Sequence, residues 1–307
     1  MFTANKGRLA LVAAAVGAVI ALSGCASSNP VEAQPSTDAG GKALIVGSQA
    51  YYSNEIVAEI YAQALEKGGY TVDRQFQIGQ REVYLPQLEA GKIDVFPEYI
   101  GSLLQALDKG AAGGTQDDVY AALKTKLPAG LKVLTPAAAS DQNSWTVTKA
   151  FAKKYNLTDI ASLKNVTEPI TVGGNSELET RPYGPSALKA KYGITTGGFT
   201  AVQDSGGPLT VKALVDNTIQ LANIYTADPN IVSNDLVALS DPDGLFFPDN
   251  IAPIVSAKVD KKAQDILNKI DAKLTAVGFV ALNAESKNEQ KSSAVIATKW
   301  LKDNDLN

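Results

Sequence analysis

Apolar residues follow two spacings along the chain: short runs typical of buried strands, and longer stretches with helical periodicity. Residues 42–48 form a short apolar run that ends in Gly-Ser, which predicts a first buried strand. Ile56 and Ile60 then share one face of a helix that Ser53 would cap and that Gly68 would end. Strand and helix keep alternating in this way, which favours an α/β protein with parallel strands in a doubly wound sheet.

The same two spacings predict the remaining elements. Further strands are expected at residues 70–78, 93–96, 131–134, 145–148, 170–173, 199–202, 219–225 and 251–256. Further helices are expected at residues 80–90, 101–107, 117–127, 150–155, 186–192, 209–215, 262–277 and 289–303. Two turn-rich stretches, residues 136–144 and 241–250, interrupt this series, and they predict that the chain crosses twice between two lobes.

The two crossings divide the chain into lobe 1, residues 42–138 and 250–307, and lobe 2, residues 139–249. Lobe 2 would be inserted into lobe 1, and the two connecting segments could act as a hinge. A cleft between two such lobes is a natural site for a small ligand.

Residues 91–104 lead from a buried strand directly into a helix. Pro97 has no N–H to donate, so it is expected to end the strand ladder, and Tyr99 follows at the strand exit. Gly101 and Ser102 open the helix, so unpaired backbone N–H groups are expected to point toward the space in front of Tyr99. Ligands bind at this edge of an open α/β sheet. The alternative is an ordinary core corner with a packed tyrosine.

Other polar and aromatic residues follow predicted strands at the same edge. Gln49 comes after the first strand, together with Tyr51 and Tyr52, one of which should point inward. Tyr225 ends a later strand as Tyr99 does. These tyrosines either face the cleft or pack in the core.

Two polar stretches hold further candidates. Arg181 lies in a loop after a strand, where its planar guanidinium could bind a ligand carboxylate or pair with Glu177 or Glu179. Asp141 and Asn143 lie at the first predicted crossing, where they could face a ligand or hold a turn. The sequence favours neither role for Arg181.

The first 24 residues have the pattern of a lipoprotein signal peptide. Lys6 and Arg8 precede an uncharged apolar run that is short for a membrane span, and small residues lead to Cys25. We expect a lipid on Cys25 that holds the protein at the extracytoplasmic face of the cell membrane. Residues 25–41, rich in Ser, Pro, Ala and Gly, would form a flexible tether. The alternative is a plain signal peptide with an incidental cysteine.

Composition narrows the chemistry available. The chain has no histidine and one cysteine, so the commonest general base, a disulfide and a cysteine-based metal cluster are all missing. The formal charge of −4 becomes −6 once Lys6 and Arg8 are removed, which argues against nucleic acid as a partner. Glycine pairs at 173–174, 197–198 and 206–207 do not match a nucleotide-binding fingerprint. No metal or cofactor is expected.

Taken in order, several motifs resemble one known family. They are Val46-Gly-Ser-Gln49, the helix at residues 59–65, Gln80-Arg-Glu-Val83, residues 91–101, Trp145-Thr-Val-Thr-Lys149, Arg181 followed by Gly184 and Tyr192-Gly193, and residues 236–253 through Phe246-Phe247-Pro248. From residue 44 to about residue 300 the chain resembles the substrate-binding lipoproteins of osmoprotectant ABC transporters, which take up glycine betaine, choline, carnitine and related quaternary amines. The resemblance implies a two-lobed, type II periplasmic-binding-protein-like fold and a permease partner.

The resemblance also implies roles for single residues. In that family tyrosines surround the trimethylammonium group, which has no N–H to donate and is recognised by the negative faces of aromatic rings. By position, Tyr99 and Tyr225 match cage residues, Ser102 matches a threonine near the ligand, Gln49 matches a polar anchor and Arg181 lies near a carboxylate-binding arginine.

The chain departs from the family pattern at two places. Asp141 to Asn143 and Asn250 stand where the family has aromatic residues. The cage is therefore expected to be either partial or completed by Tyr51, Tyr52, Tyr183 or Trp145. The predicted site comprises Tyr99, Tyr225, Gln49, Ser102, Arg181, Asp141, Asn143, Asn250 and Tyr52, with no catalytic residue.

Three other functions remain open from the residues. A two-lobed receptor could bind another small solute, such as an amino acid or ectoine. An extracellular hydrolase could use Asp141 with Glu98 or Asp228 as an acid and base pair. A purely structural surface lipoprotein would account for the tether but not for polar and aromatic residues at several strand ends.

Overall fold

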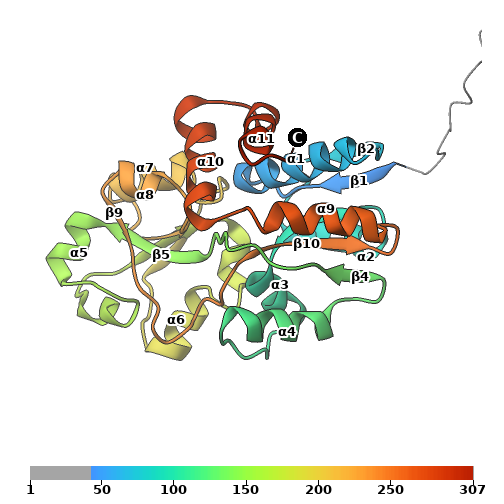
Figure 1. Ribbon diagram of the computed structural model, residues 1–307. Coiled ribbons are helices and arrows are strands. Elements are labelled where there is room, and N and C mark those ends of the chain that lie inside the picture. The colour runs from blue at the N-terminus through green and yellow to red at the C-terminus, as the bar shows by residue number, and fades with distance from the viewer. Residues whose placement is uncertain (1–42, 307) are drawn as a thin grey trace, which may run out of the picture. The chain divides into compact units, whose positions relative to one another are not determined.

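A computed structural model describes residues 43–306 of the chain, within one compact unit that spans residues 41–307. The predicted signal peptide, the tether and Cys25 lie outside the described residues. Strands and helices alternate through the described part and build two separate five-stranded sheets (Figure 1). None of the described helices is both long and apolar enough to cross a membrane.

The first sheet has the strand order β2-β1-β3-β10-β4. Its strands are β1 (Leu44–Gly47), β2 (Val72–Gln75), β3 (Val95–Tyr99), β4 (Leu131–Val133) and β10 (Ile251–Ser256). Strand β1 pairs in parallel with β2 and β3, whereas β10 runs antiparallel to β3 and β4. Figure 1 shows β10 beside β4, although more than a hundred residues separate them in the sequence.

The second sheet repeats this arrangement, with the order β7-β6-β8-β5-β9. Its strands are β5 (Asn143–Thr148), β6 (Thr171–Gly174), β7 (Gly198–Ala201), β8 (Leu221–Tyr225) and β9 (Leu236–Ala238). Strand β6 is parallel to β7 and β8, and β5 is antiparallel to β8 and β9. Each sheet therefore contains one strand that enters it after a crossing, β10 in the first and β5 in the second.

The prediction of parallel strands is wrong for β10 and β5, which pair antiparallel. Ile251 at the start of β10 pairs with Tyr99 at the end of β3, and Asn143 at the start of β5 pairs with Tyr225 at the end of β8. After each crossing the chain enters the sheet at the edge where the parallel strands end. The entering strand, β10 or β5, must therefore run antiparallel to them.

Pro97 does not end its strand as expected, because it faces Pro253 across the ladder. In an antiparallel pair, facing residues alternate between pairs that exchange backbone hydrogen bonds and pairs that do not. Two facing prolines can occupy a pair of the second kind, because no N–H is needed there. The carbonyl of Pro97 accepts a hydrogen bond from the Asn54 amide at 2.7 Å. Strand β3 therefore continues to Tyr99.

Helices cover both sheets. They are α1 (Tyr52–Lys67), α2 (Arg81–Glu89), α3 (Ile100–Leu107), α4 (Gln116–Lys126), α5 (Lys149–Tyr155), α6 (Pro185–Tyr192), α7 (Pro208–Val215), α8 (Asn230–Ser233), α9 (Lys261–Asp271), α10 (Ala276–Glu289) and α11 (Ser293–Asp303), with short 3-10 turns at Ala161–Asn165 and Ser176–Thr180. Ser53 lies inside α1 rather than capping it, because the helix already begins at Tyr52.

The C-terminal helices also differ from the expectation of two helices. The chain forms three, because Thr275 caps α10 by accepting a hydrogen bond from the Gly278 N–H at 3.0 Å. Val277 and Val280 of α10 are exposed while Phe279 and Leu282 are buried. Apolar residues therefore lie on both faces of α10, which hides its helical period in the sequence.

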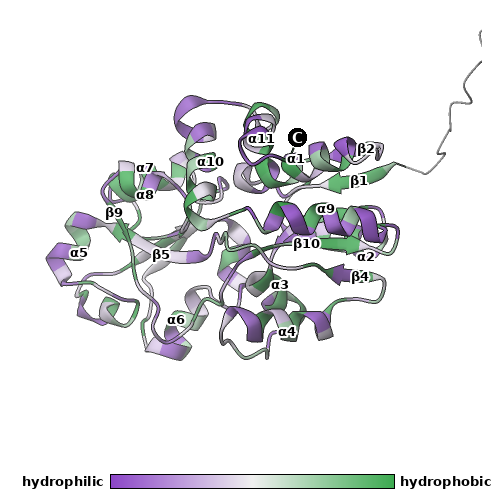
Figure 2. Cartoon of the chain, in the orientation of Figure 1, coloured by the Kyte–Doolittle hydropathy of each residue, from purple (hydrophilic) through white to green (hydrophobic). Residues whose placement is uncertain are grey.

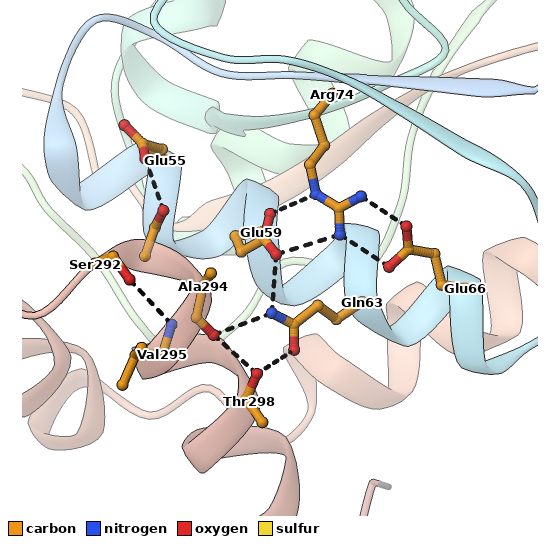
Figure 3. Close-up of polar contacts among 10 residues, drawn as sticks. Glu55, Glu59, Gln63, Glu66, Arg74, Ser292, Ala294, Val295 and Thr298 are labelled. Carbon is orange, nitrogen blue, oxygen red and sulfur yellow. Dashed lines mark hydrogen bonds and ion pairs between the residues drawn. The ribbon is translucent and has the colours of Figure 1, made fainter.

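The core of the first sheet is closed by α1, α9 and α11. Strands β1 and β10 are largely hydrophobic (Figure 2), and their side chains pack with residues such as Ile60, Leu267 and Trp300 of these helices. Polar contacts reinforce the outer side of α1 (Figure 3). Arg74 bonds Glu59 and Glu66 at 2.6–3.2 Å and so ties β2 to α1. Gln63 of α1 and Thr298 of α11 share a hydrogen bond of 2.9 Å.

Candidate ligand-binding site

A pocket lies between the carboxyl edges of the two sheets. The pocket has a volume of about 630 Å³, which includes the part open to solvent. Residues of both sheets and both crossings line it, among them Gln49, Tyr51, Gln80, Arg81, Tyr99, Ser102, Asp141, Asn143, Asn175, Glu177, Arg181, Tyr183, Ser205, Asn223, Tyr225 and Asp249. The two crossings also contact each other, because Ser140 forms a β-bridge with Asn250.

Three tyrosines gather where the parallel strands end. Tyr99 ends β3 and Tyr225 ends β8, and the ring centre of Tyr225 lies 4.8 Å from that of Tyr51. The Tyr51 hydroxyl donates to Asp228 at 3.2 Å. The buried Tyr99 hydroxyl and the Gln49 side-chain nitrogen have no hydrogen-bond partner among the described residues. A buried polar group without a partner is costly, so these two are suited to bind a ligand.

Asp141 is a deeply buried carboxyl of the pocket wall, with 2% of its surface exposed. Its Oδ1 accepts the backbone N–H of Ala227 at 2.8 Å, and its Oδ2 accepts the Ser53 hydroxyl at 3.2 Å. Burial raises the pKa of Asp141 to about 8, and the nearby Asp228 and Asp249 carboxylates add to the rise. At neutral pH the neutral form of this carboxyl therefore predominates.

Asp249 belongs to the second crossing, and its carboxylate binds to the first turn of helix α3. It accepts hydrogen bonds from the Ser102 backbone N–H, at 2.8 Å, and from the Ser102 hydroxyl. The expectation that the N–H of Ser102 is free is therefore wrong. Burial raises the pKa of Asp249 to about 6. The close approach needs Gly101, because a Cβ there would lie 2.6 Å from the Pro248 carbonyl oxygen.

Arg81 lies at another part of the wall, 7% exposed, and is held rigidly by Glu98. Its Nε and Nη2 donate to the two Glu98 oxygens at 2.9 and 3.0 Å. Glu98 also accepts hydrogen bonds from the Tyr84 hydroxyl and from the Tyr99 N–H, the latter at 2.7 Å. The third nitrogen of Arg81, Nη1, makes no hydrogen bond within residues 43–306, so it remains available to a ligand.

Arg181 reaches across the pocket from the second sheet to helix α2. Its Nη2 lies 2.9 Å from a carboxylate oxygen of Glu82. Neither sequence-predicted partner, Glu177 or Glu179, forms this pair. Nearby, the Gln80 amide donates to the Ser205 hydroxyl at 3.1 Å, again across the pocket. These two contacts connect the two sides of the protein directly.

Comparison with known proteins identifies the family of this chain. A family model described as the substrate-binding domain of the ABC-type glycine betaine transport system matches residues 42–303. The chain belongs to this family. It is thus a substrate-binding protein of an ABC-type glycine betaine transport system, and the family is one of transport proteins.

Individual relatives are more distant. The chain is 26% identical over 276 residues to the glycine betaine-binding protein YehZ of Escherichia coli (strain K12), covering 84% of this chain and 89% of that one. It is also 26% identical to the ergothioneine transport permease/ergothioneine binding protein EgtU of Helicobacter pylori (strain G27), over 85% of this chain and 47% of that protein. The chain thus spans about half of the length of this second relative.

A solved structure supports the fold. The crystal structure of a glycine betaine/carnitine/choline ABC transporter superposes with a TM-score of 0.69 at 20% identity, over 86% of this chain and 99% of the other. The prediction of a two-lobed α/β binding-protein fold is confirmed.

The structure places most of the predicted site residues of this binding protein on the pocket wall. These are Gln49, Tyr99, Ser102, Asp141, Asn143, Arg181 and Tyr225. Tyr52 and Asn250 are absent from that wall. Tyr52 begins α1 and makes an edge contact with Tyr51, with 4.6 Å between the ring centres. The Lys287 ammonium group lies 4.1 Å from the centre of the Tyr52 ring. The Asn250 amide instead donates to the Ala137 carbonyl at 3.1 Å and holds the crossing.

Among the aromatic residues suggested to complete the cage, Tyr51 and Tyr183 line the pocket. Trp145 is fully buried in the second core, where it packs on Phe246. Sequence reasoning missed Arg81 and Asp249. One signal for Arg81 was available: Glu98 stands in a strongly apolar strand, and a buried carboxylate needs a cationic partner.

Proposed function

We propose that this protein captures a quaternary-amine osmoprotectant, such as glycine betaine or choline, outside the cell membrane and delivers it to the permease of its transporter. The observation that carries the proposal is the pocket, where one part of the wall holds tyrosines and a carboxyl without a basic partner and another part holds two arginines. Such a pocket suits a molecule with a methylated cation at one end.

The cation end consists of Tyr51, Tyr99 and Tyr225 around Asp141. Their rings offer negative faces to a trimethylammonium group, and each ring contributes about 0.5 to 2 kcal/mol when water is excluded. The Asp141 carboxyl lies close enough to raise the pKa of all three tyrosines. A cation held among these rings would therefore be close to this carboxyl.

The opposite end suits a carboxylate. Arg81 presents Nη1 from a guanidinium that Glu98 has already fixed, so little side-chain entropy is lost on binding. Arg181 also lines this end, with only 13% of its side chain exposed. We infer that glycine betaine or carnitine would point its carboxylate toward these arginines, whereas choline would use only the cation end.

The contacts between the two sides support a closing motion. Arg181 with Glu82 and Gln80 with Ser205 join the loops that follow strands of the second sheet to the start of helix α2 across the pocket. Separating the sheets would break both contacts and open the pocket to solvent. We propose that a bound ligand favours the closed arrangement and that the permease recognises it.

We further propose that residues 1–24 are removed as a signal peptide and that a lipid on Cys25 anchors the protein, with residues 25–41 as a tether. Metabolic labelling with a radioactive fatty acid checks this. The wild type should be labelled, and a Cys25→Ser variant should remain unlabelled and appear in the medium. Equal labelling of both forms would refute the anchor.

An enzymatic role has little support from the geometry. Glu98 is fully buried and is bound by Arg81 and Tyr84, and Asp228 is absent from the pocket wall, so neither is placed to act with Asp141 on a substrate. A receptor for another solute remains the second candidate, because a distant relative is named for ergothioneine.

Calorimetric titration of the mature protein with glycine betaine, choline, carnitine, ectoine and ergothioneine tests the proposal. Micromolar binding of a quaternary amine, weakened at least about tenfold (roughly 1.4 kcal/mol) by Tyr99→Ala, is expected. Tyr155→Ala is the control, because Tyr155 lies in α5 and packs on Phe151, outside the pocket wall. Binding of ectoine or ergothioneine, with no binding of glycine betaine, choline or carnitine, would overturn the proposal.

A further inference from the structure

The carboxyl of Asp141 bonds to both sides of the protein, that is, to the part built on the first sheet and to the part built on the second. Ser53, whose hydroxyl donates to Oδ2, belongs to α1 of the first side. Ala227, whose N–H donates to Oδ1, belongs to the turn after β8 of the second side. The carboxyl itself comes from the first crossing. Any change in its charge therefore alters hydrogen bonds to both sides at once.

Asp141 also lacks a counter-ion. The titratable groups that interact with it are Tyr51, Tyr52, Tyr99, Tyr225, Asp228 and Asp249. Three cations lie further along the pocket wall or beside these groups: Arg81, Arg181 and Lys287. The two arginines pair with Glu98 and Glu82, and Lys287 lies over the ring of Tyr52. Within the described part of the chain, no lysine or arginine forms an ion pair with Asp141.

A buried carboxyl in these surroundings is kept neutral by the cost of burying its charge. Burial raises the pKa of Asp141 to about 8, so at pH 7 most molecules without ligand carry a proton there. A cation that enters among the tyrosines changes this balance, because an opposite charge within a few ångströms favours the ionised form. A quaternary ammonium cannot lose its own charge in response, since it carries no proton.

We propose that Asp141 is the counter-ion of the bound cation and that it releases its proton to solvent when the cation enters the pocket. The O–H bond of the carboxyl breaks, the proton leaves to water or buffer, and the carboxylate balances the ammonium charge. This inference rests on the proposed function and adds a regulation to it, since the affinity for the cation then depends on pH.

Ionisation also strengthens the link between the two sides. A carboxylate accepts stronger hydrogen bonds than a neutral carboxyl does, and both its donors, Ser53 and Ala227, are already in place. Entry of the cation therefore tightens the contact between α1 and the turn after β8. In this way the charge of the ligand, rather than its shape alone, favours closure.

The first test is calorimetry of the mature protein with choline and with glycine betaine at pH 7, in phosphate and in Tris. These buffers differ in ionisation enthalpy, so the difference in heat counts the protons released. Release of most of one proton per bound choline is expected, and the association constant should rise with pH between pH 6 and 8 by at most about tenfold per unit. The neutral isostere 3,3-dimethyl-1-butanol should release no proton.

Variants assign the proton to its source. Asp141→Asn keeps the hydrogen-bonding shape and should abolish the release. The matched control is Asp271→Asn, which removes another buried carboxyl with a raised pKa, held by Tyr61 and absent from the pocket wall. It should leave the release unchanged. Ser53→Ala removes a hydrogen bond that lowers the pKa of Asp141, so it should move the pH midpoint of proton release upward.

The outcomes separate this inference from the proposed function. Choline binding without proton release in the wild type would refute the inference and leave the function intact. Equal proton release by wild type and Asp141→Asn would assign the proton to another group and would also refute it. Failure of the wild type to bind any quaternary amine would overturn the function itself. If Asp141→Asn does not fold, the direction of the shift in Ser53→Ala decides, and an unchanged midpoint refutes the inference.

Discussion

The two ends of the pocket differ in how a buried ionisable group is balanced. At one end, Arg81 is a buried cation whose charge is already balanced by Glu98, with two hydrogen bonds of 2.9 and 3.0 Å. At the other end, Asp141 is a buried carboxyl that has two neutral hydrogen-bond donors and no cation. The first group keeps its charge with or without a ligand. The second can keep its charge cheaply only when a ligand supplies the opposite one.

The two ends therefore have different roles in binding. The arginine end is preorganised, so it can select ligands by the presence of a carboxylate without changing state. The Asp141 end is responsive, because its protonation depends on what the pocket contains. Tyr225 lies between them, since the charges of Asp141, Arg81 and Arg181 all act on its pKa. Separate changes at each end should therefore have separable effects.

The largest effect is expected at the aromatic wall, which serves every quaternary amine. Replacing both Tyr99 and Tyr225 by alanine removes one ring from each sheet and should weaken choline and glycine betaine alike, by about a hundredfold or more. Titration calorimetry measures the loss, with the single variants as references. If one ligand is unaffected, its cation does not lie between these rings.

The next effect should separate the ligands. The double variant Arg81→Met with Glu98→Gln removes both charges of the buried pair, so no uncompensated charge is left in the core. Glycine betaine should bind about tenfold more weakly, whereas choline should lose less than about threefold.

The matched control for this pair is Arg74→Met with Glu59→Gln. It removes another arginine–glutamate pair, on the outer side of α1 (Figure 3), and should change neither affinity. An equal loss of both ligands in the Arg81 variant would mean that the pair only supports the structure around Tyr99.

A smaller effect is expected from the contact across the pocket. Glu82→Gln breaks the pair with Arg181, but Glu82 is 57% exposed, and exposed ion pairs contribute at most about 1 kcal/mol. Affinity for both ligands should fall by less than about fivefold, and small-angle scattering should show less compaction at a given ligand concentration. Glu168→Gln breaks the surface pair with Lys154 and serves as control. A gain in glycine betaine affinity would instead show that Glu82 competes with the ligand for Arg181.

The sequence was a good guide where a residue's position follows from chain direction. Tyr99 and Tyr225 lie in the pocket because both end parallel strands, and parallel strands end at one edge of a sheet. It was a poor guide where pairing across the chain decides. Three contacts join segments far apart in the sequence: the facing prolines of β3 and β10, the hydrogen bond from Ser102 to Asp249, and the ion pair of Arg181 with Glu82.

Local geometry set a second limit. Tyr51 and Tyr52 are adjacent and identical in type, and only the exact start of α1 decides which of them faces the pocket. The missed pair of Arg81 and Glu98 shows a different cause. Glu98 stood in an apolar strand and required a buried cation, but several arginines and lysines were available to satisfy it.

The last prediction concerns the stability of the protein without ligand rather than its affinity, and it tests the Asp141 end alone. Burial raises the pKa of Asp141 above its ordinary value near 4 to about 8. The ionised form is therefore disfavoured in the folded state, and this group destabilises the protein progressively as the pH rises from about 4 to about 8. The rise in pKa from about 4 to about 8 corresponds to about 5 kcal/mol at pH 8.5. Asp141→Asn removes that loss, so its melting temperature should exceed that of the wild type by roughly 10 °C at pH 8.5 and by less at pH 5.

Scanning calorimetry at the two pH values measures this difference, and saturating choline should reverse it, because the cation stabilises the carboxylate and not the amide. Melting temperatures of wild type and variant that run parallel across this pH range would show that Asp141 is ionised even in the empty pocket. The contrast between the two ends would then disappear, since both would hold permanent charges.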